Sequence, residues 1–237
     1  MTTNLDHLLK DKALDWGADF YGAAHLALAR EAILEQGGAE IASFPNAIAV
    51  GIALLHPIVD QLPRRKERAV AVSYLHHCYD LVNLRLDTIA SRLAGVLQRE
   101  GYRALPIPAS RRVDDERDCG SFSNKLSAHL AGLGWIGKSC LLVTPEVGPR
   151  VRWATVHPDA PLETQGQPVE DGCGECRECV DICPVKAFTG QPFRVGEGRE
   201  ARFDAGKCHR YFERMKEKSE ETAVCGLCLY VCPYGRK

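Results

Sequence analysis

The 237-residue sequence has no long apolar run and no excess of charge of one sign. No window reaches the ~18 consecutive apolar residues that a membrane-spanning helix needs. The 30 Lys and Arg residues and 31 Asp and Glu residues nearly cancel, so no overall field favours nucleic acid or an anionic membrane. The N-terminal residues lack the charged, apolar and cleavage regions of a secretory signal, and they lack a twin-arginine pair. We therefore expect a protein of the cytoplasm.

The cysteines number 11, an odd count. The chain is also far longer than the small secreted domains that disulfides hold together, so a disulfide scaffold is disfavoured. Eight of the cysteines instead gather near the C-terminal end, in two runs with one cysteine between them. The runs are Cys173-x2-Cys176-x2-Cys179-x3-Cys183-Pro184 and Cys225-x2-Cys228-x3-Cys232-Pro233, with Cys208 between them.

The first run matches the bacterial ferredoxin pattern. In that pattern three closely spaced thiolates hold one 4Fe-4S cluster, and the fourth, just before proline, binds the other cluster. The second run supplies the reciprocal half. Zinc sites also use paired C-x2-C runs, but the doubled C-x2-C-x3-C-P ending is not a zinc feature, so we predict two 4Fe-4S clusters and electron transfer as the minimum function. The predicted ligands are Cys173, Cys176, Cys179 and Cys232 for one cluster and Cys183, Cys208, Cys225 and Cys228 for the other.

The N-terminal part predicts an α/β fold. Residues 46–55 form a near-continuous apolar run between two prolines, which is typical of a strand buried on both faces. Residues 67–100 carry apolar side chains at spacings of three and four without a slip, which predicts one long helix. Further helices are expected over residues 4–16 and 26–36, the latter ending at Gly37-Gly38, and further strands over residues 18–23, 102–107, 140–144 and 151–157, the last two joined by a turn.

Residues 158–172 are rich in Pro, Gly and Gln and are the best candidate linker. We therefore predict two domains, with the boundary inside this segment. Residues 1–165 form the α/β domain, and residues 166–237 form a domain like a bacterial ferredoxin with two clusters and short helices.

Residues 111–118 (RRVDDERD) form a polar loop, and such loops on a rigid scaffold often carry reacting groups. A helix capped by Ser121 or Ser123 is expected to follow and to run into residues 132–138 (GLGWIGK). This segment spells G-x-G-x-x-G, but a dinucleotide site needs a strand before the glycines and a helix after them. Here a helix enters and a strand leaves. The glycines either let the backbone approach a flat or bulky group closely or make a tight turn.

Residues 131–152 (AGLGWIGKSCLLVTPEVGPRVR), the Asp159–Leu162 tail and the two cysteine runs together resemble the epoxyqueuosine reductases and, more distantly, the corrinoid iron–sulfur reductive dehalogenases. The similarity extends over about residues 70–235. It implies an α/β part that binds cobalamin in its base-off form, capped by the cluster domain, with clusters that deliver single electrons to cobalt. It also implies an oxidoreductase that removes an oxygen or halide group.

The resemblance implies roles for individual residues outside the cysteine runs. Asp118 matches the proton donor, with Asp114 and Asp115 as rivals if the loop is shifted. Such a donor needs a raised carboxyl pKa, from burial or from nearby acids. Tyr79 falls beside a tyrosine–histidine pair of the reductases, where Asp80 replaces the histidine. The implied cofactor contacts are Tyr79, Lys125, Gly134, Trp135, Gly137 and Lys138.

The partners follow from the same comparison. Epoxyqueuosine reductases continue past the second cysteine run with helical repeats that help to hold tRNA, whereas this sequence stops at Lys237, so tRNA is not expected as a partner. We expect a low-potential electron donor such as ferredoxin or flavodoxin, and a small-molecule or partner-protein substrate. The leading hypothesis is a cytosolic, cobalamin-dependent iron–sulfur reductase. The alternatives are an electron-transfer module that reduces or reactivates the corrinoid of a partner protein, and an α/β part that holds a flavin or no cofactor.

Overall fold

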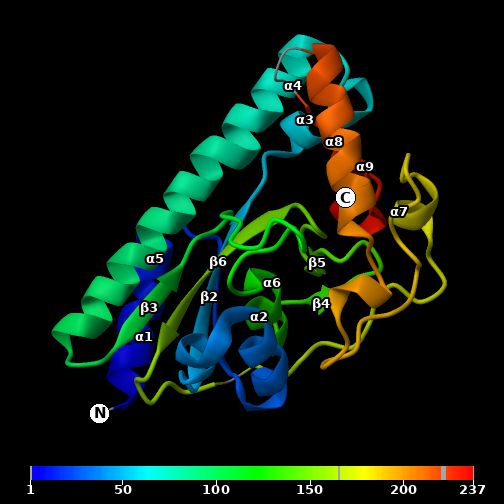
Figure 1. Cartoon of the computed structure of the whole chain (residues 1–237). Helices are drawn as coiled ribbons and strands as arrows, with labels where there is room; N and C mark the ends of the chain where they lie inside the picture. The colour runs from blue at the N-terminus through cyan, green and yellow to red at the C-terminus, as the bar shows by residue number, and fades with distance from the viewer. Residues whose placement is uncertain (1, 165, 220–222, 237) are drawn as a thin grey trace.

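A four-stranded antiparallel sheet with the order β1-β2-β6-β3 lies at the centre of the N-terminal part. The computed structural model describes residues 2–164, 166–219 and 223–236; Gln165, the last residue of the predicted first domain, lies outside the described residues. Figure 1 shows helices on both sides of this sheet and the C-terminal segments beside it. The strands are β1 Phe20–His25, β2 Asn46–Ala53, β6 Val151–Pro158 and β3 Ala104–Ile107.

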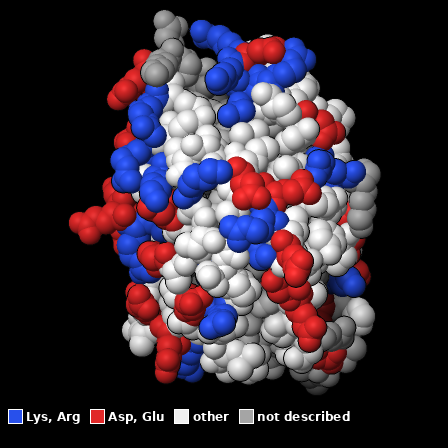
Figure 2. Space-filling model, turned by 90° about the vertical axis from the view of Figure 1, so that its right-hand side faces the viewer, with Lys and Arg blue, Asp and Glu red and all other residues white. Residues whose placement is uncertain are grey.

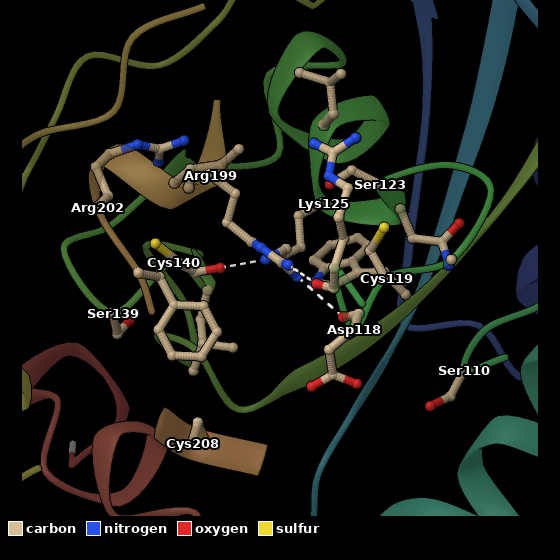
Figure 3. Close-up of a pocket in the computed structure, with 18 of the residues that line it drawn as sticks. Ser110, Asp118, Cys119, Ser123, Lys125, Ser139, Cys140, Arg199, Arg202 and Cys208 are labelled. Atoms are coloured by element: carbon tan, nitrogen blue, oxygen red, sulfur yellow. Dashed lines mark hydrogen bonds between the residues drawn. The ribbon is translucent and has the colours of Figure 1, made fainter. Parts of the chain in front are cut away.

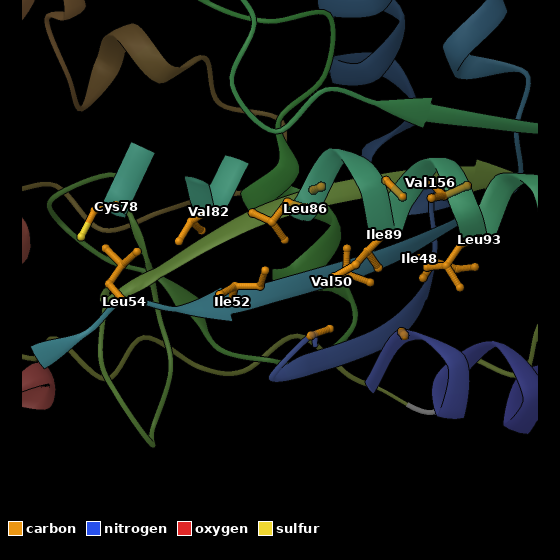
Figure 4. Packing of buried hydrophobic residues seen from close by; sticks show 14 of the residues in the cluster. Ile48, Val50, Ile52, Leu54, Cys78, Val82, Leu86, Ile89, Leu93 and Val156 are labelled. Atoms are coloured by element: carbon orange, nitrogen blue, oxygen red, sulfur yellow. The ribbon is translucent and has the colours of Figure 1, made fainter. Parts of the chain in front are cut away.

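Strand β2 is buried along almost its whole length, which confirms the prediction from its apolar sequence. Ile48, Val50 and Ile52 face the helices α1 (Thr2–Asp15) and α5 (Val82–Arg99), and they share a core with Leu93 (Figure 4). Ala47 belongs to a separate cluster on the opposite face, under α2 and α6. The sheet is therefore covered on both faces although its strands are antiparallel.

The remaining helices differ in length. Helix α2 consists of two helical segments that meet at Gly38, whose φ of +79° is not helical, so the first segment ends at the predicted Gly37-Gly38 stop. Ser123 occupies the N-cap position of α6, one of the two predicted positions, but its side chain makes no capping hydrogen bond. These helices are α2 Arg30–Ala42, α3 His56–Val59, α4 Arg68–Leu75, α6 Asn124–Leu130, α7 Glu178–Asp181, α8 Ala205–Ser219 and α9 Leu227–Tyr230.

The predicted single helix over residues 67–100 is wrong at its middle. Helix α4 passes into a π-helical turn, His76–Leu81, before α5 begins. A π-helical turn contains one more residue per hydrogen-bonded ring than an α-helix, so the apolar face changes register there. Val72 is consequently 46% exposed, and Cys78 is buried.

The predicted hairpin of residues 140–144 and 151–157 is also wrong. The turn between them exists, closed by hydrogen bonds of 3.0 Å between Thr144 and Gly148. However, β5 (Leu142–Val143) pairs with β4 (Trp135–Ile136), while β6 inserts between β2 and β3. Strand β6 is buried on both faces, so it is stabilised in the middle of the main sheet and not beside a two-residue strand.

Helices α7, α8 and α9 belong to the C-terminal part, which Figure 1 places beside the β4–β5 side of the molecule. Figure 2 shows that Lys and Arg side chains and Asp and Glu side chains are interspersed on the face turned to that side. Within the ranges that the structure describes, no helix is long and apolar enough to cross a membrane.

Packing of α5 on the sheet gives a test of the fold. Leu93 is 0% exposed, so Leu93→Ala should lower the free energy of unfolding by about 2–5 kcal/mol through the cavity that it leaves. Leu84 is 64% exposed in the same helix, and Leu84→Ala should change the free energy of unfolding by less than about 0.5 kcal/mol. Chemical denaturation followed by circular dichroism measures both. Equal effects of the two substitutions would contradict the packing described.

Candidate functional site

Three cysteines of the first run and one of the second run meet at a small cavity of about 50 Å³. Cys232 leaves the neighbours of its own run and lies with the first three cysteines. Lys138 and Tyr234 also line the cavity. The four cysteines are the set expected from the ferredoxin pattern: Cys173, Cys176, Cys179 and Cys232.

The other four cysteines line one side of a much larger cavity of about 900 Å³. Cys183 crosses over from the first run, and the backbone N–H of Ala187 donates a 3.3 Å hydrogen bond to its Sγ. Cys208 lies in the first turn of α8. This helix brings Cys208, which is distant in sequence, next to the other three cysteines. The set is Cys183, Cys208, Cys225 and Cys228.

Burial first, and then the neighbouring Cys225 and Cys183, raise the pKa of the Cys208 thiol to about 11. The same two causes, burial first, raise the pKa values of Cys179, Cys228 and Cys232. Thiolates crowded in this way repel one another, and bound metal ions supply the positive charge that stabilises them. Both sets therefore have the chemistry of metal-cluster ligands.

The glycine-containing segment packs against the first cysteine set. The Trp135 indole N–H donates a 3.4 Å hydrogen bond to Cys173 Sγ. Lys138 is buried, and its Nζ donates to the carbonyls of Gly174 at 2.5 Å and Cys176 at 3.1 Å. Of these two predicted cofactor contacts, Lys138 lines the small cavity and Trp135 bonds to a cysteine that lines it, and neither lines the large cavity.

The glycines of this segment allow close approach, one of the two roles expected for them. A Cβ on Gly137 would lie 3.1 Å from Cys173 Sγ, and one on Gly134 would lie 2.2 Å from the Val143 carbonyl oxygen. Helix α6 precedes the glycines and β4 runs through them, so the order of elements is not that of a dinucleotide site, as expected.

The large cavity lies between the α/β part and the C-terminal part. Its wall is built from α6, the loop before α6, the π-helical turn and residues 193–203, in addition to the second cysteine set. Figure 3 shows Asp118, Lys125 and Arg199 converging on this space, with Cys208 below them. A cavity of this size that mixes apolar and polar walls is typical of a small-molecule or cofactor site.

Asp118 is the acid of the 111–118 loop that lines the cavity. Its carboxylate lies 2.8 Å from Arg112 Nε, and its backbone has φ +52°, an uncommon value for a residue other than glycine. Arg199 Nη1 holds this backbone by donating to the Asp118 carbonyl at 3.1 Å. The rival Asp114 instead accepts a 2.8 Å hydrogen bond from the Arg117 N–H, and the Asp115 side chain is 95% exposed.

Tyr79 and Lys125, the other two predicted cofactor contacts, do line the large cavity. The Arg152 guanidinium lies 4.0 Å from the centre of the Tyr79 ring. Lys125 donates to the Cys140 carbonyl, and burial lowers the pKa of its ammonium group, with a further contribution from nearby arginines. The π-helical turn presents Tyr79 to the cavity, and such turns often occur at functional sites.

The sequence reasoning missed the arginines of the cavity wall. Arg199 and Arg202 come from the segment between Cys183 and Cys208. Its length was the one available signal, because a functional insertion and a passive loop look alike in sequence.

Comparisons with known proteins agree with this arrangement. Residues 172–235 match the 4Fe-4S double cluster binding domain. An epoxyqueuosine reductase of Bacillus anthracis is 33% identical over 125 residues, which are 49% of this chain and 30% of that protein. The tetrachloroethene reductive dehalogenase of Sulfurospirillum multivorans is 28% identical over 197 residues, which are 80% of this chain and 35% of that protein. The chain spans about a third of the length of these relatives.

The fold also resembles a solved structure. A reductive dehalogenase described in connection with B12-dependent dehalogenation superimposes with a TM-score of 0.70 at 21% identity, over 97% of this chain and 31% of that one. At this identity the likeness shows the fold. Taken with the sequence relatives, it means that the chain is similar to the epoxyqueuosine reductases and the reductive dehalogenases, and that residues 172–235 match a 4Fe-4S double cluster binding domain.

Proposed function

We propose that the protein is a cobalamin-dependent iron–sulfur oxidoreductase that removes an oxygen or halide group from its substrate. The observation that carries the proposal is the position of the second cysteine set, which borders the same large cavity as Asp118. A redox centre and an acid would then border the same cavity, and the reductive removal of an oxygen or halide group needs both electrons and a proton.

Two 4Fe-4S clusters would supply single-electron transfer. Cys173, Cys176, Cys179 and Cys232 would hold one, and Cys183, Cys208, Cys225 and Cys228 the other. The donor sets fit, because each supplies four thiols around one cavity and because N–H groups already point at Cys173 and Cys183. We assign Gly134, Trp135, Gly137 and Lys138 to the surroundings of the first cluster.

A base-off corrinoid in the large cavity would supply a strongly nucleophilic, low-potential cobalt centre. Support comes from the dehalogenase described as B12-dependent, which shares the fold, and from the size and mixed lining of the cavity. Tyr79 and Lys125 would contact the cofactor. The Tyr79 ring offers an apolar surface, and the Arg152 guanidinium packs on this ring. The Lys125 ammonium offers a hydrogen-bond donor that is oriented by its bond to the Cys140 carbonyl.

Asp118 would be the residue that passes a proton to the departing group, because it is the acid of the 111–118 loop that lines the cavity. Arg112 orients the carboxylate at 2.8 Å, and Arg199 fixes the loop backbone. Residues 193–203 form part of the wall on the side of the C-terminal part.

The first cysteine set lies nearer to the protein surface, since Cys176 is exposed and Cys183 of the second set is buried. We therefore propose that an external low-potential donor, a ferredoxin or flavodoxin, docks on this side, in the cytoplasm. Residues 166–237 would form the cluster domain and residues 1–165 the corrinoid domain, as the sequence predicts.

Replacement of single ligands tests the crossed cysteine sets. Cys232→Ser should reduce the iron and acid-labile sulfide bound after anaerobic reconstitution to about half. Cys119→Ser is the matched control, because Cys119 lies outside both runs and should not change the iron content. Electron paramagnetic resonance should show one cluster signal lost. Full iron content in Cys232→Ser would contradict the assignment of Cys232 as a cluster ligand.

The hydrogen bond from Trp135 gives a second test of the crossed sets. Trp135→Phe removes a donor to Cys173 Sγ and should lower the reduction potential of one cluster, since N–H···S bonds stabilise the reduced form. The cluster that shifts in a potentiometric titration should be the one that Cys232→Ser loses. Trp153→Phe is the control, because its indole N–H makes no hydrogen bond to a described residue. A shift in the other cluster would contradict the crossing of Cys232.

The corrinoid and Asp118 are tested together. Anaerobic protein should retain cobalamin with a base-off absorption spectrum. Asp118→Asn should keep clusters and corrinoid but slow reduction of an aryl halide or epoxide test substrate by about 10²–10⁴-fold. Asp115→Asn, at a 95% exposed side chain, should have no effect. Failure to retain corrinoid would favour the electron-transfer module that serves a partner's corrinoid.

A further inference from the structure

We infer that Arg199, Arg202 and Lys125 form an oxyanion-binding subsite in the wall of the large cavity. The ligand chemistry is a phosphate or a carboxylate. The subsite itself stands on its own geometry, and only the choice between its two sources rests on the proposed function.

Arg202 is the central observation. It is 4% exposed and lines the cavity, but its Nε and Nη1 donate no hydrogen bond to any described residue. The nearest carboxylate oxygen, on Glu197, lies 3.7 Å from Nε, beyond hydrogen-bond distance. The ring of Phe193 lies 4.6 Å from its guanidinium carbon. A buried guanidinium with free donors is costly, and a bound anion would satisfy it.

Two further cations, Arg199 and Lys125, line the same cavity as Arg202. The Arg199 Nε also lacks a hydrogen-bond partner among the described residues. Burial lowers the pKa of the Lys125 ammonium, and the two arginines lower it further. An anion between them would remove this repulsion.

Three acids also line the cavity near this cluster: Asp118, Glu197 and Glu200. Glu197 forms an ion pair with Arg202 at 3.7 Å but accepts no hydrogen bond from its Nε. Glu200 lies 3.7 Å from Arg199 and 3.6 Å from Arg117, and its side chain is 55% exposed. Asp118 directs its carboxylate to Arg112 at 2.8 Å. Figure 3 shows the Arg199 side chain reaching toward Lys125 and Asp118, with Arg202 on the same side of the pocket, above Cys140.

The planar fork of an arginine matches two oxygens of one phosphate or carboxylate, which a point charge does not do. Two sources can bring such a group. One is the phosphodiester of the nucleotide tail of a complete cobalamin. The other is an acidic group on the substrate. Both would lie in the same cavity as Asp118 and the second cysteine set.

The experiment uses the full chain with its clusters reconstituted. Calorimetric titration with inorganic phosphate and with benzoate measures the subsite without corrinoid. Arg202→Gln should weaken binding of the better probe at least ~10-fold, because it removes a charged bidentate donor. Arg194→Gln is the matched control, since Arg194 is exposed in the same segment and does not line the cavity. Arg202→Lys keeps the charge without the fork and should give an intermediate loss.

Corrinoid binding, followed by absorption, then separates the sources. If the anion is the nucleotide phosphate, Arg202→Gln should weaken cobalamin at least ~10-fold and leave cobinamide, which lacks that phosphate, unchanged. If the anion belongs to the substrate, both corrinoids should bind equally well to Arg202→Gln and to the unaltered protein.

The subsite would be overturned if phosphate, benzoate and both corrinoids each bound with the same affinity to the unaltered protein, to Arg202→Gln and to Arg202→Lys. If neither corrinoid binds at all, the proposed function fails, but the phosphate and benzoate titrations still decide the subsite. Iron content and the thermal midpoint check that each variant is folded, and Arg202→Lys serves if Arg202→Gln is not.

Discussion

The arrangement depends on two cysteines, Cys183 and Cys232, that each lie with the thiols of the other run. This exchange makes the two runs one unit, because neither cavity is complete without both. It brings α7 and α9 together although almost fifty residues separate them. It also turns one thiol set toward Trp135 and the other toward Asp118, so the α/β part is in contact with both.

Much of this could be predicted because cysteine spacing fixes ligand geometry directly. The pattern before each proline was enough to pair the sets, including the distant Cys208. The buried strand β2 was predictable for a similar reason, since an apolar run between prolines has few alternatives. Its antiparallel neighbours were not, because which strands pair is decided by long-range contacts and not by local pattern.

Other features needed the fold. The change of register at the π-helical turn leaves the apolar spacing nearly intact, so periodicity alone predicted one helix. The resemblance favoured Asp118 but left Asp114 and Asp115 as rivals, and the loop backbone places only Asp118 of the three in the cavity wall. Lys138 looked like a cofactor contact but donates to carbonyls beside the first cysteine set. The sequence shows that Arg199 and Arg202 are charged, but only the fold shows that both line the cavity and that Arg202 is buried.

The π-helical turn has a consequence for how this protein can change over time. The wider i→i+5 ring takes up one extra residue at His76–Leu81 locally, so the helical turns on either side keep their direction. Loss of one residue there would restore an ordinary α-helix and remove the turn that presents Tyr79 to the cavity, while α4 and α5 kept their packing.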